Sequence, residues 1–238
     1  MNEFQVAIRS PRTLFPQRLF SVETATAPMD ETLLHPREYA LVHNAVAKRK
    51  GEFAAGRHCA RLALARLQIS APAILQDANG CPLWPKGSVG SISHTKDFII
   101  SVVGRSSQVA SLGVDVDSLL APFPYDVLGY VCRREELRWL HSMPAESMRL
   151  HAYALFSVKE TIYKCVYGAT GDQLDFSDAL LNFDLRTGLF RAQLERAVGS
   201  EGRKVLVGRV GCNAEHVFSG MWWLPAEGTH NEPLALDK

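Results

Sequence analysis

The amino-acid sequence predicts an α+β fold with a pseudo-twofold duplication of two similar halves, each a small antiparallel sheet packed with a long helix. Two observations support this expectation. Apolar residues recur at helical intervals in residues 36–67 and again in residues 148–167. Each stretch lies among short segments rich in Val, Ile and Leu, which are typical of strands. We expect residues 1–111 to form the N-terminal half and residues 112–238 the C-terminal half.

The N-terminal half is expected to begin with extended segments that lead into the first long helix. Prolines at positions 11, 16 and 28 disfavour helix across residues 1–34. Pro36 suits the first turn of the helix that follows, because proline lacks an amide proton that this position does not need. Gly51 and Gly56 weaken the expectation that this helix is unbroken.

Two strands, 98–103 and 109–116, are expected to pair as a hairpin, because the five residues between them are typical of a turn. Antiparallel pairing about a turn centred near Ser106 sets which residues face each other. This register would bring His94 and Asp117 to the same end of one sheet.

The C-terminal half is expected to contain a short helix over residues 134–141 and the second long helix, which Gly168 would end. The remaining alternation of apolar and polar residues predicts strands over residues 180–185, 189–194, 204–210 and 217–224. The chain from His230 onward is expected to be a polar tail.

Composition and charge narrow the range of functions. The chain has 26 Lys and Arg against 25 Asp and Glu, so its formal net charge of +1 gives no overall attraction to nucleic acid or to an anionic membrane. The five cysteines are scattered and form no C-x-x-C pair, which predicts reduced thiols and a cytoplasmic protein. No run of eighteen apolar residues occurs, so no membrane-spanning helix is expected.

Asp115 and Asp117 are two residues apart in a predicted strand, so their side chains should point to the same face of the sheet. Two such carboxylates repel each other unless a cation lies between them, and Mg²⁺ would fill that role. An Asp-x-Asp pair alone also marks many ordinary strand ends. Glu160, four residues before Lys164, is equally typical of an exposed ion pair on a helix.

Basic residues and one histidine could add phosphate binding to these carboxylates. The run Lys48-Arg49-Lys50 would more often be a solvated face than a binding site. Arg57 and Arg61, four residues apart, could share a helix face, and guanidinium groups match phosphate oxygens with two parallel hydrogen bonds. A histidine at such a position is more often an ordinary surface residue than a catalytic one, and only the expected hairpin favours a role for His94.

Four segments resemble, in the same order, the motifs of the 4′-phosphopantetheinyl transferases. They are residues 49–57 (RKGEFAAGR), 90–95 (GSISHT), 113–117 (GVDVD) and 156–164 (FSVKETIYK). The resemblance covers roughly residues 45–170, and both the chain length and the first motif are similar to the enterobactin-synthesis branch of the surfactin-type subfamily. Family members of this type are monomers built from two similar halves.

The resemblance implies a specific reaction. The enzyme would transfer the 4′-phosphopantetheine arm of coenzyme A to a serine of an apo acyl, peptidyl or aryl carrier protein, and adenosine 3′,5′-bisphosphate would be released. Coenzyme A would be the co-substrate, bound between the halves, and Mg²⁺ the metal, with Mn²⁺ as an alternative. The N-terminal half would carry the phosphate-binding motifs of this coenzyme and the C-terminal half the metal carboxylates.

The same resemblance assigns roles to individual residues. The metal ligands would be Asp115, Asp117 and Glu160. The groups that hold coenzyme A would be Arg49, Arg57, Lys86, Ser93, His94, Lys159 and Lys164. The catalytic group would include His94 and Lys164, with Glu160 or Glu135 as the base that removes the proton of the carrier serine, Glu160 being preferred. The subfamily usually has Asp-x-Glu at residues 115–117, so the shorter Asp117 is expected to reach the metal through water.

Two other functions remain open from the residues alone. A Mg²⁺-dependent nucleotide or diphosphate hydrolase could use the same carboxylates and arginines, and it would cleave a diphosphate with no carrier protein present. A non-enzymatic protein could bind nucleic acid through residues 48–61, in which case binding would weaken with salt and would not need Mg²⁺. No histidine and cysteine spacing predicts a zinc site.

Overall fold

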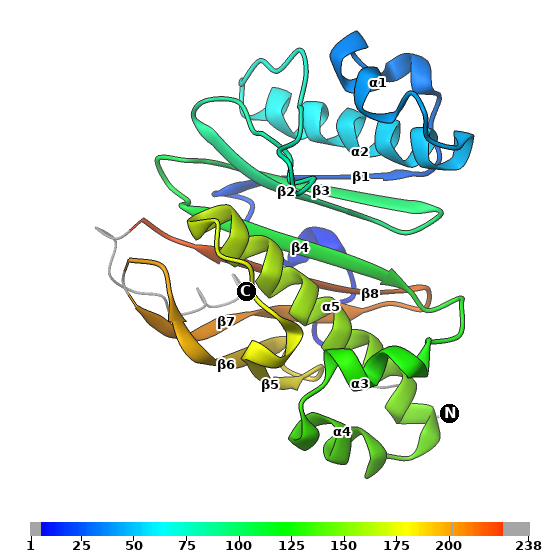
Figure 1. The fold of residues 1–238 in the computed structure, drawn as a ribbon, viewed down its shortest axis with the longest axis vertical. Coiled ribbons are helices and arrows are strands. Elements are labelled where there is room, and N and C mark those ends of the chain that lie inside the picture. The colour runs from blue at the N-terminus through cyan, green and yellow to red at the C-terminus, as the bar shows by residue number, and fades with distance from the viewer. Residues whose placement is uncertain (1–5, 201, 226–238) are drawn as a thin grey trace.

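The computed structural model describes residues 6–200 and 202–225, which form two antiparallel sheets with helices packed on them (Figure 1). The helices are α1 (Pro36–Val42), α2 (Ala47–Arg66), α3 (Leu128–Val131), α4 (Arg134–His141) and α5 (Ala145–Thr170). The strands are β1 (Phe20–Thr26), β2 (Ser88–His94), β3 (Phe98–Arg105), β4 (Ser111–Ser118), β5 (Ala179–Asp184), β6 (Leu189–Val198), β7 (Arg203–Cys212) and β8 (His216–Trp223). The expected α+β class is confirmed, and the expected polar tail lies outside the described residues.

The smaller sheet has the strand order β1-β3-β2, and α2 packs against all three strands. The helical region expected over residues 36–67 is two helices, because the chain turns after Val42 and α2 starts anew at Ala47. Gly51 and Gly56 do not break α2. A methyl group at Gly51 would lie 2.6 Å from Pro28, so this glycine lets the segment before α1 pack directly on α2.

The larger sheet has the strand order β4-β8-β7-β6-β5, and α5 packs against β4 and β8 (Figure 1). The contact between α5 and β4 is close because Gly113 has no side chain. A methyl group there would overlap the carbonyl oxygen of Thr161 and would lie 2.9 Å from the amide nitrogen of Cys165. Just before the acidic residues of β4, the strand and the C-terminal half of α5 are therefore held together by a backbone contact.

The expected hairpin between residues 98–103 and 109–116 is wrong. β3 pairs with β1 and β2 in the smaller sheet, whereas β4 pairs with β8 in the larger one. The turn residues after β3 are present, but the chain uses them to pass from one sheet to the other. The hairpin that does form joins β2 to β3, with His94 opposite Ile99.

The two sheets meet where β2 lies beside β4, and serine side chains connect these strands. The hydroxyl oxygen of Ser91 accepts a hydrogen bond from the amide of Val114 at 3.1 Å, and that of Ser93 accepts one from the amide of Val116 at 3.3 Å. An apolar core shared by both sheets lies behind this junction and includes Val102. The halves therefore form one packed body.

A buried carboxylate holds the helices of the smaller sheet in place. Glu38 is fully buried, and its oxygens accept hydrogen bonds from the amide of His35 at 2.9 Å, the amide of Ile74 at 2.8 Å and the guanidinium of Arg61 at 2.7 Å. It thus closes the first turn of α1, pairs with a cation of α2 and anchors the loop that follows.

The larger sheet repeats this arrangement with different residues. Glu136 is 3% exposed and accepts hydrogen bonds from the amide of Arg133 at 2.7 Å, the amide of Leu181 at 2.8 Å and the ammonium of Lys159 at 2.7 Å. It closes the first turn of α4, pairs with a cation of α5 and anchors β5. We call Glu38 and Glu136, with these partners, the two braces, and their likeness is the clearest mark of duplication.

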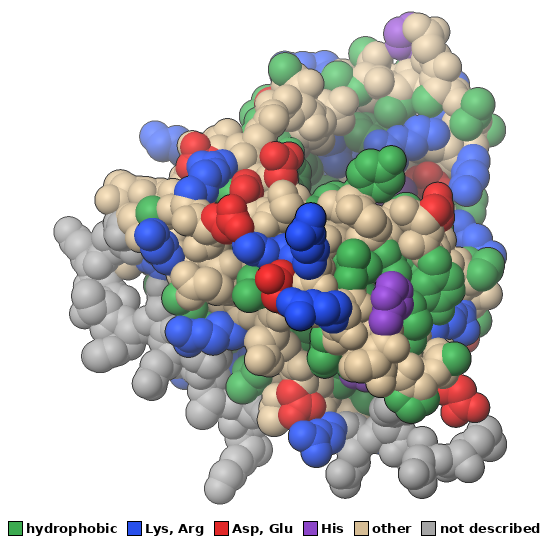
Figure 2. Space-filling view, turned by 60° about the horizontal axis from the view of Figure 1, so that its bottom comes forward, with side chains coloured by type: hydrophobic (Ala, Val, Ile, Leu, Met, Phe, Trp, Pro, Cys, Tyr) green, Lys and Arg blue, Asp and Glu red, His purple; other side chains and the backbone are tan. Residues whose placement is uncertain are grey.

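Charges of both signs lie close together on the face in Figure 2, and none of the described helices could span a membrane. The face in Figure 2 carries basic and acidic side chains next to each other, as the net charge of +1 suggests. No helix in the described ranges is both long and apolar enough to cross a bilayer.

The C-terminal brace leads to a stability prediction. Lys159→Met should lower the free energy of unfolding by about 3–5 kcal/mol, because it leaves the buried Glu136 carboxylate without its cation. Urea unfolding monitored by circular dichroism measures this change. Lys204→Met, which alters an exposed lysine of β7, should change stability by less than about 0.5 kcal/mol. A stable Lys159→Met protein that binds coenzyme A weakly would refute the structural role.

Candidate active site

The candidate site lies at the end of β4, next to the junction of the two sheets. Asp115 is 5% exposed, and its Oδ1 accepts hydrogen bonds from the hydroxyl of Ser93 at 2.8 Å and from the ammonium of Lys164 at 2.7 Å. These three residues come from β2, β4 and α5. Strand alternation places Asp117 on the same face as Asp115, and the charge of Asp115 acts on Glu160 of α5.

The second oxygens of both aspartates carry no hydrogen bond. Oδ2 of Asp115 and Oδ2 of Asp117 are buried, and the described residues supply no partner for either atom. Burial, together with repulsion from Asp115, raises the pKa of Asp117 to about 7. Burial also raises the pKa of Glu160, against the opposing effect of Lys164. When they are ionised, the carboxylates of Asp115, Asp117 and Glu160 carry more negative charge than the single ammonium group of Lys164 balances.

The carboxylates do not form a closed set of metal ligands. Within residues 6–200 and 202–225, no group of three or more His, Cys, Asp or Glu side chains is arranged to hold a metal ion. The position next to Oδ1 of Asp115 is taken by the ammonium of Lys164. What the protein offers a cation is the pair of buried, unpartnered Oδ2 atoms of Asp115 and Asp117.

His94 and Arg49 lie on the N-terminal side of the site. The Nη1 atom of Arg49 is 3.1 Å from Nε2 of His94, so the guanidinium donates to an unprotonated ring nitrogen. Burial lowers the pKa of His94, and the positive charge of Arg49 acts in the same direction. The imidazole is therefore neutral at pH 7 and the guanidinium carries the charge.

Arg57 lies deeper than expected for a group that binds a phosphate. It is 4% exposed, its Nε donates to the carbonyl of Ile74 at 2.7 Å, and its guanidinium lies 4.1 Å from the ring centre of Phe53. Burial, together with repulsion from nearby Arg49, lowers the pKa of Arg57 to about 10. Arg57 remains a cation at pH 7 and contributes a buried positive charge behind Arg49.

A pocket of about 480 Å³ opens beside Lys164. Its walls come from the loop between α2 and β2, from β2 and from the last two turns of α5, and its larger side chains are Leu83, Trp84, Ile92, Tyr163 and Tyr167. Among the described residues that line it, Lys164 and Asp77 are the only charged ones. Such a mostly apolar pocket beside charged groups is typical of a small-molecule site.

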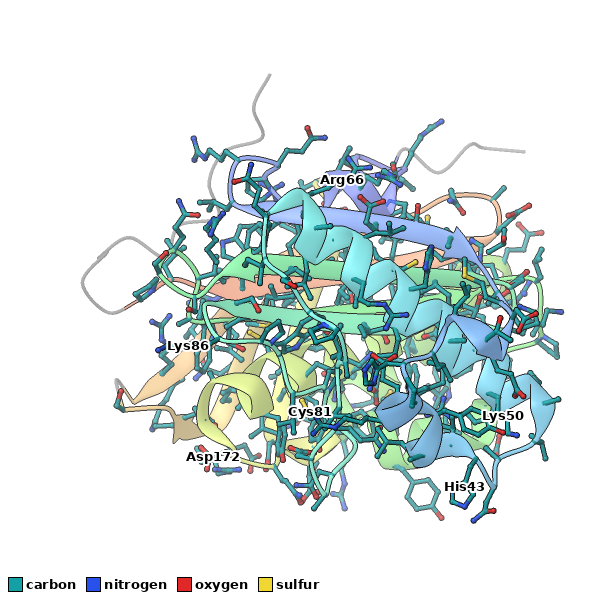
Figure 3. The ribbon with its side chains drawn as sticks, turned by 90° about the horizontal axis from the view of Figure 1, so that it is seen from above. His43, Lys50, Arg66, Cys81, Lys86 and Asp172 are labelled. Atoms are coloured by element: carbon teal, nitrogen blue, oxygen red, sulfur yellow. The ribbon has the colours of Figure 1, made fainter. Side chains whose placement is uncertain are left out.

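Three residues expected in the site have other places in the structure. Lys159 donates its three protons to Glu136 and to the carbonyls of Val131 and Phe176, so the structure places its ammonium in the C-terminal brace. Glu135 is exposed and lines a groove with β5 and β6, and the described residues of that groove include neither Asp115 nor Glu160. Lys86 is exposed in the turn before β2, at the opposite end of this strand from His94 (Figure 3).

The Ser93 side chain also departs from expectation. Its hydroxyl is buried and already donates to Asp115 while it accepts from the amide of Val116. It therefore orients a carboxylate and joins two strands, and it could not contact a phosphate without losing this bond. The sequence analysis missed the partner role of Ser91, although its place two residues before Ser93 would have put both hydroxyls on one face of a strand.

The analysis also missed a set of polar contacts beside the pocket. The hydroxyl of Tyr167 donates to Oδ2 of Asp77 at 2.7 Å and accepts from Nδ2 of Asn79 at 2.7 Å. The sequence Asp77-Ala78-Asn79-Gly80 is a recognisable turn signal. Its partner on α5 is ninety residues away, and no local pattern indicates it.

Comparison with known proteins bears on the same segments. Residues 37–104 match the family model of the 4′-phosphopantetheinyl transferase N-terminal domain, and residues 111–205 match that of the 4′-phosphopantetheinyl transferase superfamily. The transferase Svp of Streptomyces mobaraensis is 40% identical over 188 residues, which is 74% of this chain and 76% of Svp. The transferase PptT of Mycobacterium tuberculosis is 36% identical over 182 residues, or 75% and 77% of the two chains.

A more distant relative covers a smaller part of the chain. Enterobactin synthase component D of Salmonella austin is 32% identical over 125 residues, which is 52% of this chain and 50% of that protein. The ranges of the two family models include β2, which carries the junction serines, and the carboxylates of β4 and α5. The chain is therefore a member of the 4′-phosphopantetheinyl transferase family, and it is an enzyme that transfers the phosphopantetheine group of coenzyme A to carrier proteins.

Proposed function

We propose that this transferase binds the diphosphate of coenzyme A at Asp115, Asp117 and Glu160, with a divalent cation between the carboxylates and the diphosphate. The observation that carries the proposal is the pair of buried aspartate oxygens without a hydrogen-bond partner. A buried carboxylate oxygen is unfavourable unless it is paired, so these atoms are suited to a cation that arrives with the substrate.

Mg²⁺ fits this set of groups. It usually takes only one or two protein carboxylates and completes its octahedral shell with water and substrate phosphates, so a closed set of protein ligands is not required. Asp115 and Asp117 would hold it through their free oxygens, with Glu160 beside them, and Mn²⁺ could replace it. When bound, such a cation supplies positive charge that stabilises the leaving diphosphate oxygen.

Different basic residues around the carboxylates would bind different phosphate groups of the coenzyme. Lys164 lies next to Asp115 and can turn its ammonium to the phosphate that is transferred. Arg49 and His94 lie on the other side of the junction, where a guanidinium and a neutral imidazole can hold the remaining phosphate oxygens. Arg57 adds a buried positive charge near Arg49. The uncharged portions of the coenzyme extend into the pocket of about 480 Å³ beside Lys164.

Glu160 is the residue that we assign as the base. The carrier serine must lose its proton as its oxygen attacks phosphorus, and adenosine 3′,5′-bisphosphate then leaves. Burial raises the pKa of Glu160, which makes its carboxylate a better proton acceptor than an exposed one. Glu135 lines a different groove and is not proposed for this step.

Location and assembly stay predictions from the sequence. We propose a cytoplasmic monomer, and the five cysteines, all of which are free thiols, are suited to a reducing compartment. The division into halves at residue 112 is likewise a proposal. It is supported by the change of sheet between β3 and β4.

The proposed site predicts which change abolishes transfer. Asp115→Ala should lower the rate of mass gain of an apo carrier, incubated with coenzyme A and Mg²⁺, by at least about a thousandfold, because it removes a cation ligand and the partner of Lys164. Intact-protein mass spectrometry of the carrier measures this. Asp184→Ala, which removes a partly exposed aspartate paired with Arg186, should leave the rate unchanged. Cleavage of coenzyme A without any carrier would favour a hydrolase instead.

The raised pKa of Asp117 predicts a dependence of stability on pH. Between the ordinary value of 3.8 and about 7, the folded protein holds a proton that the unfolded chain has released, so stability falls as pH rises through this range. Asp117→Asn should therefore stabilise the metal-free protein at pH 8 by about 1–3 kcal/mol and have little effect at pH 4. Urea unfolding in a chelator, at both pH values, measures the difference. An equal effect at both would contradict the assignment.

A further inference from the structure

A polar clasp connects the two halves at a distance from the carboxylates. Tyr167 of α5 contacts Asp77 and Asn79, which belong to the loop between α2 and β2, and Asn79 also accepts a hydrogen bond from Gln173 at 3.5 Å. We call the contacts of Asp77 and Asn79 with Tyr167 the clasp. The junction serines hold the halves together behind the site, whereas the clasp holds them together on the pocket side.

The loop that enters the clasp has a fixed local structure. Oδ1 of Asp77 accepts hydrogen bonds from the amides of Asn79 and Cys81, both at 2.9 Å, and Gln76 forms a β-bridge with Pro82. These contacts close the loop on itself without help from α5. The clasp therefore positions a preformed loop as a unit and does not need to order it residue by residue.

The pocket beside Lys164 lies between this loop and α5. Along α5, Tyr167 follows Lys164 by nearly one turn, a rise of about 4.5 Å toward the C-terminal end of the helix. Cys81 of the loop and Tyr167 of the helix both line the pocket. In Figure 3 the loop with Cys81 lies over the end of α5, where Asp172 is labelled. One pocket wall thus depends on the loop staying in contact with the helix.

We propose that Asp77, Asn79 and Tyr167 are positioning residues for coenzyme A, which hold the pocket wall in its binding position before the coenzyme arrives. The proposal rests on the proposed function, in which coenzyme A extends from the carboxylates into this pocket. A wall that is already in place spares the coenzyme the free energy of ordering it, so the clasp acts on affinity. The reacting groups at Asp115, Lys164 and His94 lie outside the clasp.

The proposal predicts an effect on KM without a matching effect on kcat. Tyr167→Phe removes the hydroxyl and keeps the ring, whose centre lies 6.0 Å from that of Tyr163. We expect KM for coenzyme A to rise about threefold to tenfold, the equivalent of one or two hydrogen bonds, while kcat stays within about twofold. Tyr39→Phe is a matched control, because it also removes a tyrosine hydroxyl, here one on α1 that accepts a hydrogen bond from Lys50 of α2. It should change neither KM nor kcat.

A double-mutant cycle separates the clasp from general loss of stability. Asn79→Ala removes one donor to Tyr167, and its effect on KM should not multiply with that of Tyr167→Phe, because both changes remove the same contact. Effects that multiply fully, or a parallel loss of kcat and thermal stability in Tyr167→Phe, would overturn the positioning role.

Cys81 provides a readout that does not require transfer. It is the one partly exposed cysteine, since Cys59, Cys132, Cys165 and Cys212 are buried. Burial raises the pKa of the Cys81 thiol, so labelling with a maleimide at pH 8.5, followed by mass spectrometry of the labelled peptide, is slow enough to compare rates. Tyr167→Phe should label faster than the unaltered chain. Desulfo-coenzyme A, which lacks the thiol and so does not consume the maleimide, should slow labelling of both.

The two readouts distinguish the possible failures. A chain that transfers normally but shows unchanged KM and unchanged Cys81 labelling after Tyr167→Phe would overturn the clasp and leave the proposed function standing. Faster labelling of Tyr167→Phe, with no protection of either protein by desulfo-coenzyme A, would support the mobile wall but overturn the placement of the coenzyme in this pocket.

Discussion

The hydrogen bonds that Ser93 and Lys164 donate to one oxygen of Asp115 join the three elements on which the site is built. The carboxylate is almost fully buried, and a buried carboxylate is stable only when its charge is balanced nearby. One balancing group comes from β2 and the other from α5, so the two sheets and the helix packed on the larger sheet have to meet here. The free oxygen on the other side is what remains for a ligand, and the stabilising contact and the binding site share one side chain.

The braces explain how a single long helix can serve both stability and chemistry. Lys159 and Lys164 are five residues apart on α5, which separates them by about 140° around the helix axis. The first therefore points to Glu136 on one side, and the second points to Asp115 on the other. The N-terminal half has the same brace in Glu38 and Arg61, but no carboxylates corresponding to the site were found on β2. The duplicated halves share the brace, and they differ in the side chains that they contribute to the candidate site.

Much of the fold followed from local patterns, and the errors have physical reasons. Helical periodicity predicted α5 and the α2 region, because these helices bury one face over many residues. The turn after β3 was recognised, but a turn signal does not say which strand the chain joins next, so the partner of β4 was missed. His94 still lies at the acidic site, since packing of β2 beside β4 brings it there. The sequence does not show whether a lysine of the motifs has a structural role, as Lys159 has, or lies in the candidate site, as Lys164 does. This depends on which side of the helix each side chain occupies.

Gly113 carries a consequence for how the site tolerates change. The carboxylates of β4 and the glutamate of α5 are kept at their separation by contact between two main chains, with no side chain in between. Substitutions elsewhere in the core alter the volume of side chains, and a packed layer of them would shift the helix relative to the strand. Here the spacing is set by atoms that every residue possesses. The geometry of the acidic site can therefore stay constant while the surrounding core diverges, as long as this one position has no side chain.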